Sequence, residues 1–159
     1  MNTRIWQLDD EAATQAHAAS IARVIQGSLI IYLHGELGAG KTRWSRGFLR
    51  ALGWQNSVKS PTYTLIETYE LARGTIYHLD LYRLADSQEL EFLGLRDMLQ
   101  EQSAIWLIEW PERGEGGLPG ADLSVALQYK ILPETGRIMT VTAFTPRGKV
   151  VLNALSELP

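Results

Sequence analysis

Residues 35–42 read Gly35-Glu36-Leu37-Gly38-Ala39-Gly40-Lys41-Thr42 and match the phosphate-binding pattern G-x-x-x-x-G-K-[ST] at every fixed position. The glycines let consecutive backbone N–H groups turn toward phosphate oxygens, where a Cβ would collide with the ligand or disfavour the positive φ angles required. The Lys41 ammonium is then placed to contact the β- and γ-phosphates, and the Thr42 hydroxyl is spaced to bind Mg²⁺. Only about one chain in a few hundred of this length would match by chance at ordinary residue frequencies.

The segments on either side of this loop have the patterns that a phosphate-binding loop requires. Residues 29–33 (LIIYL) form an apolar run of strand length before it. After it, residues 42–52 carry apolar side chains at helical spacing, and Gly53 stands where helices commonly stop. The N-terminal end of that helix would point its positive dipole at the phosphates. We therefore predict a strand–loop–helix unit that binds a nucleotide.

The composition excludes several other kinds of site. The 159 residues are 45% hydrophobic, carry a net charge of −3 and contain no cysteine, which excludes disulfides, thiolate catalysis and zinc–cysteine sites. The histidines His17, His34 and His78 show no metal-ligand spacing, and we interpret each as a structural or surface residue. A negative net charge provides no basic field for direct, sequence-specific nucleic-acid binding. No signal-peptide pattern or membrane-span-like run is evident, so we expect a cytoplasmic protein that does not enter the membrane.

Periodicity predicts the elements around the nucleotide-binding unit. Expected strands cover residues 3–8, 64–71, 75–82, 104–108, 123–130 and 137–144, and expected helices run from Asp9 or Asp10 to about 25, from Asp86, over 96–100 and from Lys149. Residues 64–82 are predicted to form an antiparallel hairpin, and residues 111–120 a loop.

Two fully apolar strands beside alternating ones predict an α/β chain with a mixed sheet. We expect a P-loop NTPase-like three-layer fold, parallel at its centre with antiparallel strands added, in one domain over residues 1–159. Ligands of such sheets bind at the carboxyl ends of the central strands.

Two carboxylates end predicted strands that we expect to lie beside the phosphate loop. Asp80 follows the run 76–79, and Glu109 follows the run 105–108. A Mg²⁺–nucleotide site needs such a carboxylate near Thr42, and a second one would orient or deprotonate the attacking nucleophile. The sequence leaves open which of the two takes which role. It also leaves open whether residues 60–64 (SPTYT) form a switch-like segment near the γ-phosphate or a turn entering the hairpin.

Three further segments point to a family. Residues 58–64 (VKSPTYT), 78–84 (HLDLYRL) and 108–111 (IEWP), combined with the phosphate loop, resemble the TsaE (YjeE) family across essentially the whole chain. These are small bacterial P-loop ATPases required to make threonylcarbamoyladenosine in tRNA. The phosphate loop is shared by many enzymes, so the other three segments carry the resemblance.

The resemblance implies an activity and partners. TsaE proteins bind ATP or ADP with Mg²⁺ and act with the TsaB–TsaD pair, in which TsaD transfers a threonylcarbamoyl group to adenosine in tRNA. The family member is thought to hydrolyse ATP to reset that complex between turnovers, and it is weakly active alone. Contact with tRNA is then expected through the partners.

The resemblance also implies site residues. By position, Thr42 and Glu109 match the family's Mg²⁺ ligands, and Asp80 matches a carboxylate important for ATP turnover. Trp110 is similar to a family tryptophan near the site, with packing as its alternative role. The implied phosphate contacts are Gly38, Ala39, Gly40, Lys41, Thr42 and Arg43, and the implied nucleotide contacts outside the loop are Glu11, Glu112 and Arg137.

Other functions fit the phosphate loop less well. A small-molecule or nucleotide kinase would carry a substrate-binding insertion with arginines that close over the phosphates, whereas the arginines here are scattered. A GTPase would usually contain an Asn-Lys-x-Asp segment, which this chain lacks. A nucleotide-dependent assembly module without significant hydrolysis remains an alternative, because weak turnover and no turnover look the same in a sequence.

Overall fold

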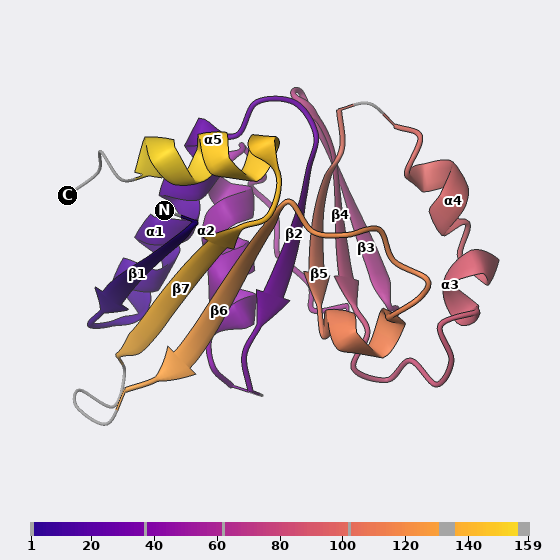
Figure 1. Cartoon of the computed structure of the whole chain (residues 1–159), viewed down its shortest axis with the longest axis horizontal. Helices are drawn as coiled ribbons and strands as arrows, with labels where there is room; N and C mark the ends of the chain where they lie inside the picture. Colours follow the sequence, from indigo (N-terminus) through magenta and orange to yellow (C-terminus); the bar gives the residue numbers. More distant parts are fainter. Residues whose placement is uncertain (1, 37, 62, 102, 131–135, 156–159) are drawn as a thin grey trace.

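The computed structural model describes residues 2–36, 38–61, 63–101, 103–130 and 136–155 (Figure 1). Leu37 of the phosphate loop and Thr62 of the 60–64 segment lie outside the described residues. The strands are β1 (Thr3–Leu8), β2 (Leu29–His34), β3 (Ile66–Leu71), β4 (Gly74–Asp80), β5 (Ile105–Glu109), β6 (Leu123–Tyr129) and β7 (Arg137–Ala143). The helices are α1 (Glu11–Val24), α2 (Lys41–Ala51), α3 (Glu89–Phe92), α4 (Leu95–Met98), α5 (Pro146–Leu155) and the 3₁₀ turn η1 (Pro111–Gly114).

All of these strands join one mixed sheet in the order β1-β7-β6-β2-β5-β4-β3. The four strands β6, β2, β5 and β4 are parallel at the centre, whereas β7, β1 and β3 add antiparallel at the two sides. The predicted mixed sheet and the β3–β4 hairpin are therefore confirmed. Of the two strands that end in the predicted carboxylates, only β5 pairs with β2, the strand that precedes the phosphate loop. β5 also pairs with β4 and so separates β4 from β2.

Helices cover both faces of the sheet, which gives three layers (Figure 1). Apolar side chains of α1, α2 and α5 pack with β2, β5, β6 and β7 into the larger core, where the Trp44 and Phe48 rings of α2 stack at 5.3 Å. On the other face, α3 and α4 cover β4 and β5 through Leu90, Leu95 and Trp106. The phosphate loop follows the carboxyl end of β2 and leads into α2. Within the described residues, no helix is long and apolar enough to cross a membrane.

Local hydrogen bonds explain where several elements begin. The Asp10 carboxylate accepts from the Ala13 N–H at 2.8 Å and begins α1, which resolves the predicted choice between Asp9 and Asp10. The helix predicted from Lys149 begins earlier, at Pro146, because the Thr145 hydroxyl accepts from the Gly148 N–H at 3.1 Å. The capping box predicted at Asp86 is absent from the described bonds of α3, where the Asp86 carboxylate accepts instead from the Gln88 N–H at 2.9 Å.

The stretch predicted as a loop over 111–120 begins with the 3₁₀ turn η1. Pro111 occupies the first turn, where its missing N–H costs nothing, and Trp110 before it takes a left-handed conformation at φ 54°. This turn fixes the position of the chain that directly follows Glu109. The local pattern did not predict it, since glycine and proline are also frequent in irregular loops.

The close packing of α1 on α2 depends on Gly47. A Cβ at this position would lie 2.6 Å from the Gln15 carbonyl oxygen of α1. We expect Gly47→Ala to lower the free energy of unfolding by about 1–3 kcal/mol, since the backbones must separate to admit the methyl group. Chemical denaturation with urea measures this difference. The control is Gly120→Ala, where a Cβ meets nothing within 4 Å, and which should stay within about 1 kcal/mol of the unmodified chain. Equal stability of the two variants would contradict the close approach of the helices.

Candidate functional site

The phosphate loop connects β2 to α2 through glycines in conformations that other residues rarely adopt. Gly38 has φ +81° and Gly40 has φ +108°, and Gly40 directly precedes the first residue of α2. A Cβ at Gly38 would lie 2.8 Å from the Tyr129 hydroxyl. The backbone angles therefore favour glycine at both positions, and at Gly38 the nearby Tyr129 hydroxyl leaves little space for a side chain as well.

Lys41 is the first residue of α2 and is almost fully buried, with 6% of its side chain exposed. Its ammonium donates to the Gly35 carbonyl at 2.7 Å and lies 3.9 Å from Glu109 Oε1 and 4.2 Å from the centre of the Trp110 ring. Burial lowers the pKa of Lys41, while the carboxylates of Glu109, Asp80 and Glu112 act in the opposite direction. The predicted phosphate-binding lysine is thus held at the loop by a carbonyl, a carboxylate and an aromatic face.

The two predicted carboxylates meet at one edge of the sheet. The Cα of Glu109 pairs with Asp80 on one side and with Leu33, at the end of β2, on the other. Because strand residues alternate between faces, Asp80 and Glu109 lie on the face of Ile76 and Leu107, which pack against the core of α1 and α2. Both are buried, at 6% and 4% exposure. The intervening strand therefore does not prevent Asp80 from reaching the phosphate loop.

One cavity brings most of the predicted site residues together. It has a volume of about 280 Å³ and lies between the loop and the carboxylates, which agrees with the position expected for bound phosphates. It is lined by Gly38, Gly40, Lys41, Thr42, Arg43, Ser60, Asp80, Glu109 and Trp110. The segment 60–64 thus reaches this cavity through Ser60, while Tyr63 is 82% exposed and contacts Arg83 instead.

The donor set of this cavity suits a magnesium ion shared with phosphates. Thr42 offers a hydroxyl, and Glu109 and Asp80 offer carboxylate oxygens, which are the hard ligands that Mg²⁺ prefers. Among the described residues, no cluster of three or more histidine, aspartate or glutamate side chains could hold a metal alone. This is the usual situation in nucleotide sites, where one or two protein ligands are completed by phosphate oxygens and water.

Three of the remaining predicted nucleotide contacts make bonds within the protein, either with each other or with the phosphate loop. Arg43 and Glu11, at the starts of α2 and α1, form an ion pair at 2.6 Å. Arg137 donates from Nε to the Ala39 carbonyl at 2.8 Å and from Nη2 to the Gly38 carbonyl at 3.4 Å, and its guanidinium stacks on the Tyr129 ring at 4.5 Å. Arg137 therefore binds the backbone of the phosphate loop directly. The resemblance gave only that it approaches the nucleotide.

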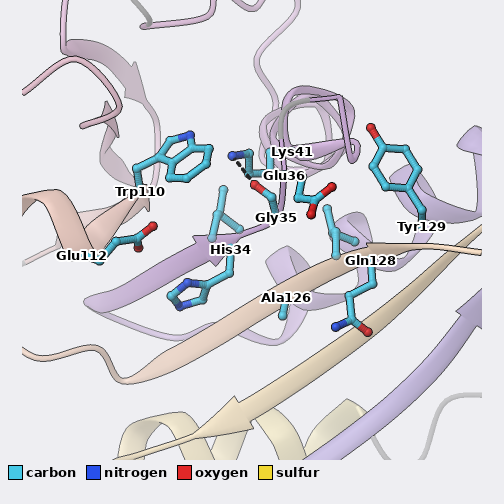
Figure 2. Close-up of a pocket in the computed structure, with 11 residues that line it drawn as sticks. His34, Gly35, Glu36, Lys41, Trp110, Glu112, Ala126, Gln128 and Tyr129 are labelled. Carbon is cyan, nitrogen blue, oxygen red and sulfur yellow. Dashed lines mark hydrogen bonds between the residues drawn. The ribbon is translucent and has the colours of Figure 1, made fainter.

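Glu112 lines a second, larger cavity on the other side of Lys41, with a volume of about 580 Å³ (Figure 2). Trp110 and Tyr129 stand at opposite sides of the space that Figure 2 shows, with the Lys41 ammonium between them. Burial lowers the pKa of His34 in this cavity, and nearby Lys41 lowers it further, whereas Glu112 raises it. The cavity opens beside Gly35 and Glu36, at the start of the phosphate loop.

Sequence reasoning missed two residues of the site. Tyr129 covers Gly38 and supports Arg137, and nothing local to β6 indicates this contact. His78, which we interpreted as structural or surface, places Nε2 2.6 Å from Glu109 Oε2 and is 1% exposed. The signal available for His78 was its spacing of two residues from Asp80, which puts both side chains on one face of a strand.

Comparison with known proteins identifies the family. The family model described as threonylcarbamoyl adenosine biosynthesis protein TsaE matches residues 8–137. The chain belongs to the TsaE family. It is 50% identical over 130 residues to the tRNA threonylcarbamoyladenosine biosynthesis protein TsaE of Haemophilus influenzae, covering 82% of this chain and 80% of that protein. The TsaE protein of Bacillus subtilis is 34% identical over 152 residues, covering 96% of this chain and 93% of that protein.

A solved structure agrees with this assignment. The crystal structure of YdiB from Bacillus subtilis superposes with a TM-score of 0.81 at 28% identity, covering 98% of this chain and 95% of that one. This similarity, with the mixed sheet, confirms the predicted P-loop NTPase-like α/β fold. The TsaE-family match also confirms the resemblance drawn from the segments around Ser60, Asp80 and Glu109.

The loop geometry leads to a prediction for Gly38. We expect Gly38→Ala to weaken ADP binding on the order of tenfold or more, because the methyl group meets the Tyr129 hydroxyl and displaces the phosphate-binding N–H groups. Isothermal titration calorimetry measures the affinity. Gly27→Ala is the matched control, since Gly27 has a similar φ of +75° but open space around it. Both variants should lose about 1–2 kcal/mol of stability from backbone strain, and only Gly38→Ala should lose affinity. Normal ADP affinity in Gly38→Ala would contradict the assigned loop geometry.

Proposed function

We propose that this chain is a Mg²⁺-dependent ATP-binding and ATP-hydrolysing protein that supports threonylcarbamoyl transfer to adenosine in tRNA by acting on a TsaB–TsaD complex. The observation that carries the proposal is the buried Lys41 ammonium, held between the phosphate loop and Glu109 with Asp80 beside it. Membership of the TsaE family supports the biosynthetic role.

Each part of the loop then has a chemical role. The backbone N–H groups from Gly38 to Thr42 bind phosphate oxygens, and the start of α2 adds its positive dipole. Lys41 leaves the Gly35 carbonyl to neutralise the β- and γ-phosphates. Thr42 and Glu109 would hold Mg²⁺, and the ion would supply positive charge beside the phosphates. Asp80, on the strand next to Glu109, orients the attacking water.

The proposal includes weak hydrolysis without partners, and the placement of the arginines supports this part of it. Phosphoryl transfer is commonly accelerated by an arginine that stabilises charge on the transferred group. Here Arg43 pairs with Glu11, and Arg137 binds loop carbonyls. Among the described residues, Arg43 is the one arginine that lines either cavity. The larger cavity beside Lys41 leaves room for a group supplied by a partner protein.

The first experiment compares phosphate release from ATP with and without a purified TsaB–TsaD pair. We expect the pair to stimulate release, because its contacts complete the site, and we expect Lys41→Ala to abolish both the basal and the stimulated rate while circular dichroism stays unchanged. Phosphate appearing on an acceptor metabolite instead of in solution would favour the kinase alternative. Nucleotide binding without stimulated hydrolysis would favour the assembly module. Unchanged ATP turnover in Lys41→Ala would contradict the site itself.

The metal role of Glu109 has a separate test. We expect Glu109→Gln to raise the Mg²⁺ concentration needed for half-maximal hydrolysis by more than about tenfold, since the amide keeps the size of the side chain but removes the anionic ligand. A magnesium titration of ATP turnover measures this value. Glu70→Gln, which removes an exposed carboxylate on β3, should follow the titration of the unmodified chain. If Glu109→Gln also followed it, Glu109 would not be a magnesium ligand.

A further inference from the structure

Glu109 divides its two carboxylate oxygens between different partners. Oε2 lies 2.6 Å from Nε2 of His78, and Oε1 lies 3.9 Å from the Lys41 ammonium. The carboxylate therefore cannot rotate freely, because one oxygen is held from the side of β4. The other oxygen faces the start of α2, where Lys41 and Thr42 line the phosphate cavity.

The strand register makes this contact a built feature. His78 pairs with Leu107, and Asp80 pairs with Glu109, so His78 and Glu109 are diagonal neighbours on the same face of adjacent strands. Diagonal neighbours lie within reach of long side chains. His78 is 1% exposed and Glu109 4% exposed, so water does not compete strongly for the bond between them.

The short contact itself decides which nitrogen of His78 carries the hydrogen. Nδ1 is buried and has no hydrogen-bond partner among the described residues, so it lacks a partner in either neutral tautomer. A hydrogen on Nδ1 would leave the Nε2 lone pair facing the lone pairs of the Glu109 carboxylate at 2.6 Å. The tautomer with its hydrogen on Nε2 replaces this repulsion with a hydrogen bond, so Nε2–H donates to Glu109 Oε2.

We propose that His78 is the positioning residue for the metal ligand: it holds Oε2 of Glu109 so that Oε1 alone is presented to a divalent cation on the bound nucleotide. The proposal rests on the proposed function, since it needs a Mg²⁺–nucleotide at the phosphate loop. It adds a role for a residue that contacts neither the cation nor the phosphates. Mg²⁺ tolerates little departure from octahedral geometry, so the orientation of a monodentate carboxylate affects its binding directly.

The test separates metal binding from nucleotide binding. Fluorescent N-methylanthraniloyl-ADP is titrated into each variant in EDTA and again at increasing Mg²⁺, and the half-saturating Mg²⁺ concentration is read from the gain in affinity. We expect His78→Leu, which keeps similar volume without a donor, to raise this concentration by about tenfold or more. Its affinity in EDTA should stay within about twofold of the unmodified chain, because the loop N–H groups are untouched.

Two further variants make the result specific. The amide nitrogen of His78→Gln stands near the position of Nε2 and can donate to Glu109, so this variant should restore most of the magnesium response. His17→Leu removes a half-buried histidine of α1 that packs on Trp6, away from the cavity. This variant should leave the magnesium response unchanged. A normal magnesium response in folded His78→Leu, or a loss in His78→Gln as large as in His78→Leu, would overturn the positioning role.

A measurement on the unmodified chain covers the case in which His78→Leu fails to fold. Two-bond ¹H–¹⁵N spectra of histidine-labelled protein, assigned with His78→Gln, report which ring nitrogen carries the hydrogen. We expect the hydrogen on Nε2, and a hydrogen on Nδ1 alone would overturn the proposal. Failure of the proposed function looks different, because the unmodified chain would then show no gain in ADP affinity with Mg²⁺, and both proposals would fall. If the unmodified chain showed a normal gain in ADP affinity with Mg²⁺ and His78→Leu showed the same gain, only the positioning role would be overturned.

Discussion

The buried contact between Lys41 and Glu109 is the constraint around which the rest of the site is arranged. An ammonium that is 6% exposed must be compensated, because removing a charge from water costs several kcal/mol. The Gly35 carbonyl and the Trp110 ring supply part of the compensation, but Glu109 supplies the opposite charge. That contact forms only if β5 lies beside β2 in the observed register, so the site depends on the order of the central strands.

The dependence of the site on strand order also explains which of its features could be predicted from the sequence. The phosphate loop, its strand and its helix are encoded within residues 29–53, so the local pattern was sufficient. The order of β2, β5 and β4 depends on pairing between segments more than 20 residues apart, and two apolar runs look alike whichever of them is central. For this reason the sequence predicted Asp80 and Glu109 as strand-end carboxylates, but it did not predict that β5 lies between β4 and β2.

The antiparallel half of the sheet contributes to the phosphate loop as well. Arg137 at the start of β7 binds the carbonyls of Gly38 and Ala39, and Tyr129 at the end of β6 lies under its guanidinium. These bonds hold the carbonyls of Gly38 and Ala39 toward the arginine and so fix the orientation of the loop backbone. The resemblance indicated Arg137 as a nucleotide residue, but only the fold shows that its bonds are made to the loop backbone.

The two carboxylates at the sheet edge are held in different ways, and this difference supports separate roles. Glu109 is bonded to a side chain, His78, on the neighbouring strand, so its orientation follows the β4–β5 register. Asp80 Oδ1 accepts from the Tyr82 N–H two residues further along its own chain at 3.0 Å, so the local turn after β4 contributes to its orientation. A ligand for a geometrically strict cation benefits from the rigid, cross-strand support. A group that orients a reacting water has to adjust as the reaction proceeds, and a carboxylate at the start of a loop is better suited to that role.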